Sequence, residues 1–149
     1  MYLCIGNGCF GNGCFGKVNK LDYEIFWFRF VFKYSYIIEI ENYDKLQDII
    51  ERDYTTFSGL MLERYFRLLA MEGGEFTRIG RWWDRRGENE IDMICEDELS
   101  DRAVFYEVKR QNDEISIGKL KQKAEVMLQA TRAFKGYKIG YEGLSMEEM

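Results

Sequence analysis

Apolar residues recur at every second position in the last two of three consecutive segments, which is the pattern of a β-strand with two distinct faces. In the last of these segments Val104, Tyr106 and Val108 share one face. Glu107 and Lys109 fall on the other face, because side chains alternate along a strand. Turn-forming and acidic residues separate the segments. The pattern predicts three successive strands, at residues 76–83, 90–95 and 103–109.

Apolar residues at helical spacing flank these strands on both sides. One helix is predicted at 55–71, ended by the glycine pair that begins at Gly73, and another at 117–133. A last short strand is predicted at 137–141. The order helix, three strands, helix, strand predicts a mixed α/β domain over residues 54–149, with one sheet flanked by helices.

The segment 21–53 is rich in aromatic side chains, and its apolar positions are compatible with helix. The aromatic run from Phe26 to Phe32 is too apolar to be left in water. We therefore predict an aromatic helical linker that buries Trp27 and Phe30, either against the following domain or against a second copy of the chain. A homo-oligomer held through this segment is one expectation that follows.

Glycines dominate the start of the chain, where the pentapeptide Gly-Asn-Gly-Cys-Phe occurs twice in tandem, at 6–10 and 11–15. Glycine loses more backbone entropy on ordering than any other residue, so we predict a flexible tail over residues 1–20. The glycine spacing resembles that of phosphate-binding loops. However, Val18 stands where a Walker-type loop needs Ser or Thr to hold magnesium, so no nucleotide site is predicted.

The composition limits the chemistry that the chain can perform. Of 149 residues, 46% are hydrophobic and 32% are charged, which is typical of a globular protein rather than a disordered one. The sequence has no histidine, which excludes Ser-His-Asp triads and histidine-bound zinc. A net charge of −5 excludes a basic field over the whole protein. Since no signal or membrane-spanning segment is recognisable and the cysteines form no disulfide framework, we expect a cytoplasmic protein.

Carboxylates and a lysine are expected to meet on two of the predicted strands. Antiparallel pairing of 90–95 with 103–109 would place Asp92 beside Glu107, with Lys109 on the same face. Two close carboxylates repel each other unless a cation lies between them, so removing Asp92 should leave the metal-free protein at least as stable as before. Magnesium and manganese bind such carboxylates together with water. The pattern predicts a divalent-metal site in which Lys109 orients a water molecule or neutralises charge on a phosphate.

Simpler interpretations of the same residues stay open. A Glu-x-Lys pair on an exposed strand is more often a solvated ion pair than a catalytic one. Glu63, on the first predicted helix, is able to pair with Arg67 one turn later. Asp92 differs, because Ile91 and Met93 make its strand apolar on both faces. A buried aspartate costs stability unless a cation or a hydrogen-bond donor compensates it.

Together these motifs resemble the PD-(D/E)XK nuclease superfamily, whose core has the same order of helix, three strands, helix and strand. Glu-Ile-Asp at 90–92 and Glu-Val-Lys at 107–109 carry the resemblance. With Ile-Gly-Arg-Trp-Trp at 79–83 and the aromatic run at 26–31, the chain is more closely similar to a particular domain type. That type is the nuclease-like domain of unknown function at the C-terminus of archaeal and bacterial P-loop ATPases. Ile91 stands in the place of the proline that gives the superfamily its name.

This resemblance implies a restriction-endonuclease-like α/β core and roles for residues of this chain. Glu63, Asp92 and Glu107 would be catalytic carboxylates, and Lys109 would be the catalytic lysine. Asp92, Glu107 and the carbonyl oxygen of Val108 would hold Mg²⁺ or Mn²⁺.

The function that the resemblance implies is metal-dependent hydrolysis of phosphodiester bonds in DNA. Basic residues near the predicted site would contact phosphates, with a merely solvated surface as the simpler interpretation: Arg81, Arg85, Arg86, Arg110, Lys119 and Lys121. The ATPase and winged-helix domains of such proteins would be its partners, outside this chain. The alternative is a non-catalytic DNA-binding or regulatory module of a P-loop ATPase, which, unlike the enzyme, need not bind metal.

Overall fold

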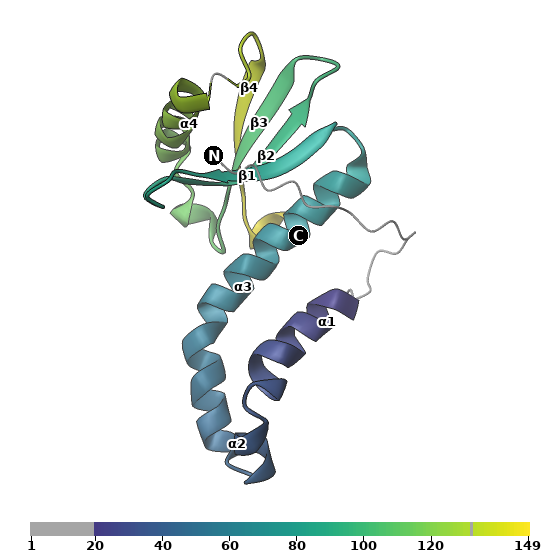
Figure 1. Cartoon of the computed structure of the whole chain (residues 1–149), viewed down its shortest axis with the longest axis vertical. Coiled ribbons are helices and arrows are strands. Elements are labelled where there is room, and N and C mark those ends of the chain that lie inside the picture. Colours follow the sequence, from purple (N-terminus) through teal and green to yellow (C-terminus); the bar gives the residue numbers. More distant parts are fainter. Residues whose placement is uncertain (1–19, 132) are drawn as a thin grey trace. The chain divides into compact units, whose positions relative to one another are not determined.

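The computed structural model in Figure 1 describes residues 20–131 and 133–149. The predicted tail, with its tandem repeat and its phosphate-loop-like glycines, lies outside the described residues except for Lys20. The chain divides into two compact units, with the boundary between Met61 and Leu62. None of the helices among the described residues has the length and apolar character needed to cross a membrane.

The first unit is built from helices around buried aromatic side chains. Its elements are α1 (Lys20–Phe26), a π-helical turn (Trp27–Phe32), α2 (Ser35–Glu39) and the first part of α3 (Tyr43–Gly73). Phe30 is fully buried, with the rings of Phe26 and Phe57 at centroid distances of 5.1 and 5.2 Å. The predicted burial of Phe30 is therefore confirmed. Trp27 is 41% exposed in the single chain, so its burial against a second copy stays a prediction.

Helix α3 is longer than the sequence pattern indicated. It runs without interruption for 31 residues, whereas the prediction ended a linker at residue 53 and began a new helix at 55. Neither proline nor glycine occurs around this point, and the threonines there lower helix propensity only slightly. The predicted end is confirmed, since Gly74 follows the helix with a positive φ of 65° that glycine adopts without strain.

The second unit is a mixed α/β domain, as predicted. Its four-stranded sheet has the order β1-β2-β3-β4, antiparallel except for the parallel pair β3–β4. Along the chain the last part of α3 is followed by three strands, a helix and a strand, which is the predicted order. Their bounds are β1 (Arg78–Trp83), β2 (Glu90–Asp97), β3 (Arg102–Val108), α4 (Ile117–Thr131) and β4 (Lys138–Leu144).

Helices cover both faces of this sheet (Figure 1). On one face, α4 packs Leu120 and Met127 against Phe105 of β3, all three fully buried. On the other, Phe66 of α3 packs against Met93 of β2. Burial of such a side chain stabilises the fold by about 1.5–3 kcal/mol, so the two layers hold the central strands β2 and β3 firmly. This double cover explains why β2 is apolar on both faces.

Candidate active site

Asp92 lies where β2 separates from β3. The β2–β3 ladder extends from the pair Asp97–Arg102 to the pair Met93–Tyr106 and stops one residue before Asp92. A β-bulge lies at the same point of β2, where its pairing with β1 changes register. The backbone N–H of Val108 donates a hydrogen bond of 2.8 Å to Oδ2 of Asp92. The carboxylate thus satisfies a buried backbone donor at the open end of the ladder.

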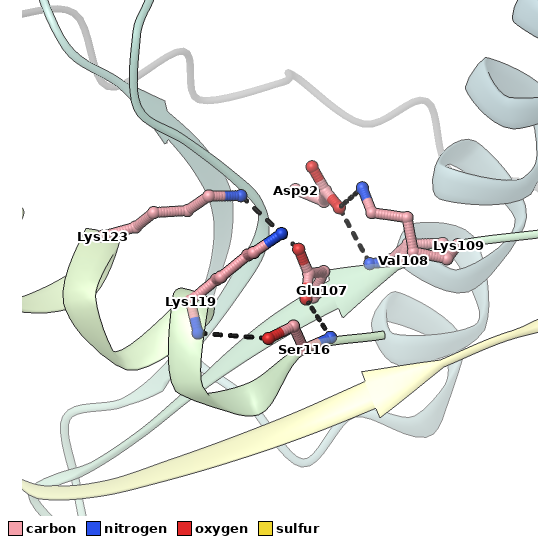
Figure 2. A network of polar contacts seen from close by, with 7 residues as sticks. All are labelled: Asp92, Glu107, Val108, Lys109, Ser116, Lys119 and Lys123. Carbon is pink, nitrogen blue, oxygen red and sulfur yellow. Dashed lines mark hydrogen bonds and ion pairs between the residues drawn. The ribbon is translucent and has the colours of Figure 1, made fainter. Parts of the chain in front are cut away.

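A lysine compensates the charge of Asp92. The residue is only 7% exposed, and Nζ of Lys109 lies 3.6 Å from the same Oδ2 (Figure 2). Lys109 directly follows β3, and its backbone N–H donates to the carbonyl of Leu144 in β4. The expectation that a buried aspartate here needs a donor or a cation is confirmed.

Glu107 has a second, separate set of partners. It is 4% exposed and receives a 2.8 Å hydrogen bond on Oε2 from the backbone N–H of Ser116, just before α4. Nζ of Lys123, in the second turn of α4, lies 3.5 Å from Oε1 (Figure 2). The structure therefore gives each carboxylate a lysine of its own.

Ser116 was missing from the predicted site, and Lys123 was not predicted as a partner of Glu107. The sequence carried a usable signal for Lys123, which lies three residues after Leu120 and four before Met127. Residues at these spacings share a helix face, and Leu120 and Met127 are buried in the core. A lysine on the buried face of a helix needs a carboxylate partner. Nothing local to Ser116 indicated that its N–H would bind Glu107.

Glu63 approaches this region from α3. Its side chain is half-buried, and its Oε2 atom is buried without a hydrogen-bond partner among the described residues. Burial raises the pKa of Glu63, and the negative charges of Asp92 and Glu90 raise it further. The expected partner Arg67 donates instead to the backbone carbonyl of Glu63, at 3.3 Å, while its positive charge opposes the rise in pKa. Asp92 is thus close enough to raise the pKa of Glu63.

These residues fit a hard cation in part. All the candidate donors are oxygens, as Mg²⁺ and Mn²⁺ prefer, and the orphaned Oε2 of Glu63 is a buried oxygen with coordination capacity to spare. No group of three or more His, Cys, Asp or Glu side chains in the described part of the chain forms a ready ligand set. Magnesium commonly binds one or two carboxylates and completes its shell with water and substrate phosphate, so two carboxylates suffice.

The predicted phosphate contacts are spread over three segments of the second unit. Arg85 and Arg86 are exposed in the turn after β1, which Asp84 organises by accepting the backbone N–H of Arg86 at 3.1 Å. Two further cations lie over aromatic rings: Arg81 over Trp83 at 5.0 Å and Lys121 over Tyr141 at 5.5 Å. The other two are Arg110, half-buried next to Lys109, and Lys119, exposed in the first turn of α4. Their contact with phosphate stays a prediction.

Comparison with known proteins gives a family and a distant relative. Residues 27–127 match the family DUF234, described as archaeal and bacterial proteins of unknown function. The protein of Methanocaldococcus jannaschii named "Uncharacterized protein MJECL04" is 34% identical over 91 residues, which are 56% of this chain and 20% of that protein. The chain thus spans about a fifth of this relative's length. No solved structure matches.

Proposed function

This chain belongs to the DUF234 family of archaeal and bacterial proteins, and from that premise we propose that its α/β unit is a divalent-metal-dependent nuclease acting on DNA. The observation that carries the proposal is the pair of buried carboxylates at the end of β2 and β3, each with its own lysine. Burying ions costs free energy that apolar residues of similar size would not cost. Clusters of buried ionisable side chains that lower stability in this way are typical of functional sites.

The topology of the unit supports a restriction-endonuclease-like core for this domain. Its element order, α3, β1, β2, β3, α4, β4, agrees with the order expected for that core. Asp92 and Glu107 come from the second and third strands, as the sequence resemblance implies. We therefore carry over the roles of Glu63, Asp92, Glu107 and Lys109 as part of the proposal.

Each residue has a chemical task in the proposed reaction. Asp92, Glu107 and the carbonyl of Val108 would hold Mg²⁺ or Mn²⁺, which when bound lowers the pKa of water and neutralises charge on phosphate. Lys109 lies at Asp92 and would stabilise the negative charge that develops on the phosphate oxygens. Glu63 is suited to accept a proton from water, because its raised pKa brings it closer to neutral pH.

DNA is the proposed substrate, and an ATPase is the proposed context. The exposed cations Arg85, Arg86, Lys119 and Lys121 provide sequence-independent phosphate contacts on a chain whose net charge is −5. The similarity to the C-terminal domain of P-loop ATPases supports a role as such a domain. Most of the M. jannaschii relative lies outside the match, which leaves room for further domains in that protein.

The test is cleavage of supercoiled, linear and branched DNA with Mg²⁺ and with Mn²⁺. We expect Asp92→Asn and Lys109→Met to lower the rate by about 100-fold or more while thermal unfolding stays cooperative. Asp92→Asn keeps an oxygen that can accept from the N–H of Val108, so the fold is disturbed least. Lys138→Met, at the far end of β4, is the control with the same change in charge as Lys109→Met. Equal cleavage by all four proteins would mean that a contaminant does the cutting.

A second candidate function is the non-catalytic DNA-binding or regulatory module. It is favoured by one observation: both oxygens of Glu107 already have protein donors. A site of this kind is stable without any metal. Titration with Mn²⁺ separates the two candidates, since the module requires no binding and the nuclease requires binding that Asp92→Asn abolishes.

A further inference from the structure

We propose that Lys123 is the built-in competitor of the divalent cation at Glu107, and that it sets the cation concentration at which the site is occupied. This inference rests on the proposed function. Its observation is that the Lys123 ammonium lies 3.5 Å from Oε1 of Glu107, whose side chain is only 5% exposed (Figure 2).

The two partners of Glu107 differ in how easily they leave. Ser116 donates its backbone N–H to Oε2, and this donor is fixed by the chain just before α4. Lys123 donates from the end of a long side chain that is 26% exposed. A lysine side chain can turn its charged end into water while its apolar stem stays packed. Oε1 is therefore the oxygen of Glu107 that a cation can take over.

At Asp92, a cation does not have to compete with protein donors for both carboxylate oxygens. The N–H of Val108 and the ammonium of Lys109 both contact Oδ2 of Asp92, so Oδ1 lies outside these two contacts. At Glu107 the two donors occupy different oxygens, Oε1 and Oε2. Binding a cation at Glu107 thus requires that Lys123 give way, whereas binding at Asp92 leaves its partners in place.

Displacement of a charged partner weakens binding of the cation that replaces it. The ammonium both occupies Oε1 and repels a second positive charge nearby. In return, the ammonium compensates the negative charge of Glu107 when no metal is bound. A buried carboxylate without such compensation would destabilise the fold. Lys123 therefore lowers the affinity for metal and stabilises the metal-free protein.

The test measures Mn²⁺ affinity of the full chain without DNA, from the electron paramagnetic resonance signal of free Mn²⁺. Lys123→Met keeps the apolar stem and removes the charge, and we expect Mn²⁺ to bind about fivefold more tightly or better. Lys123→Gln, which retains a hydrogen-bond donor for Glu107, should shift affinity in the same direction even if the Met variant folds poorly. Lys123→Arg keeps the charge and should restore the affinity of the parent.

Lys138→Met is the matched control, because Lys138 is exposed and its pairing partner in β3 is Arg102, at the end opposite Val108. Its Mn²⁺ affinity should equal that of the parent. Unchanged or weaker binding by both Lys123→Met and Lys123→Gln would overturn the inference and leave the proposed function standing. Equal tightening by Lys138→Met would overturn it too, since net charge alone would be the cause. A parent that binds no Mn²⁺ at all would overturn the proposed function, and this inference with it.

Discussion

At the scale of single residues, the three carboxylates of the site are compensated to different degrees. Asp92 has a backbone donor and Lys109, and Glu107 has a backbone donor and Lys123. Glu63 has an oxygen that is buried without a hydrogen bond. Asp92 and Glu107 are therefore integrated into the fold as well as being candidate ligands, whereas ionised Glu63 is the group that the metal-free protein tolerates least.

Removal of Asp92 tests how much this residue contributes to the stability of the metal-free protein. Repulsion between carboxylates alone predicts that Asp92→Ala leaves the metal-free protein as stable as the parent or more stable. The hydrogen bond from Val108 changes this expectation, because the buried N–H would lose its acceptor. We expect Asp92→Ala to lower the free energy of unfolding by about 1–3 kcal/mol, and Asp92→Asn to lower it less. Urea denaturation measures the free energy of unfolding of both variants. A value for Asp92→Ala equal to that of the parent would contradict the expected loss of stability.

The raised pKa of Glu63 predicts a pH dependence of stability. The folded protein holds the Glu63 proton more tightly than the unfolded chain does, so the free energy of unfolding falls as pH rises from the ordinary glutamate pKa through the raised one. Glu63→Gln removes this fall. The variant should be more stable than the parent at neutral pH, by up to about 1 kcal/mol, and should show no such gain below about pH 4.

Urea denaturation across this pH range measures the effect. Glu72→Gln, an exposed position on the same helix, is the control and should leave the profile of the parent unchanged. A Glu63→Gln profile parallel to that of the parent would show that Glu63 is solvated.

At the scale of elements, close packing between β4 and the β3–α4 connection positions Ser116. Gly143 pairs with Glu107 in the parallel β3–β4 ladder. A Cβ added at Gly143 would stand 2.4 Å from Cγ2 of Ile115, the residue before Ser116. The absence of a side chain at Gly143 thus lets the connection approach the strand, and this approach places the N–H that holds Glu107.

Gly143→Ala is expected to push Ile115 away and to loosen the hydrogen bond from Ser116 to Glu107. The free energy of unfolding should fall by about 1–3 kcal/mol, and Mn²⁺ affinity should weaken with it. Gly140→Ala, in the same strand, is the matched control, because its Cβ would meet Val104 at an ordinary 3.5 Å. If both variants behave alike in urea denaturation and Mn²⁺ titration, crowding at Ile115 does not position the site.

At the scale of the whole molecule, the candidate site belongs to one unit and the aromatic segment to the other. Glu63, Asp92 and Glu107 all follow the boundary at Leu62. The first unit exposes large rings, among them Phe28 at 60% and Phe32 at 63%. A homo-oligomer formed through these rings stays a prediction.

A shortened chain of residues 54–149 tests this division. It retains the part of α3 that carries Leu62 and Phe66, which pack on the sheet. We expect it to unfold cooperatively and to bind Mn²⁺ as the full chain does, because it keeps the sheet and the helical segments that cover both of its faces. Sedimentation of both proteins tests self-association, which should be confined to the full chain. An unfolded shortened chain would show that the first unit is needed for the second to fold.

Local spacing of apolar residues was enough to predict the elements of the second unit and their order. Alternating and helical spacing are local properties of the chain, and β1, β2, β3, α4 and β4 all appear within a few residues of their predicted positions. Local pattern also singled out Asp92, because a charged residue inside an apolar strand needs compensation whatever the fold. It failed at the start of α3, where no local signal marks whether a helix continues or begins again.

Which polar groups contact each other follows from the packing of elements that are distant in the sequence. Three contacts join residues on different elements: the β2–β3 ladder that ends at Met93, the hydrogen bond from Val108 to Asp92, and the pairing of Lys123 with Glu107. Such contacts depend on the register of strands and on how deeply a helix packs against the sheet, and neither is encoded in the spacing of residues within one segment. Within the expected cluster of Asp92, Glu107 and Lys109, Lys109 pairs with Asp92, whereas α4 contributes a separate lysine to Glu107.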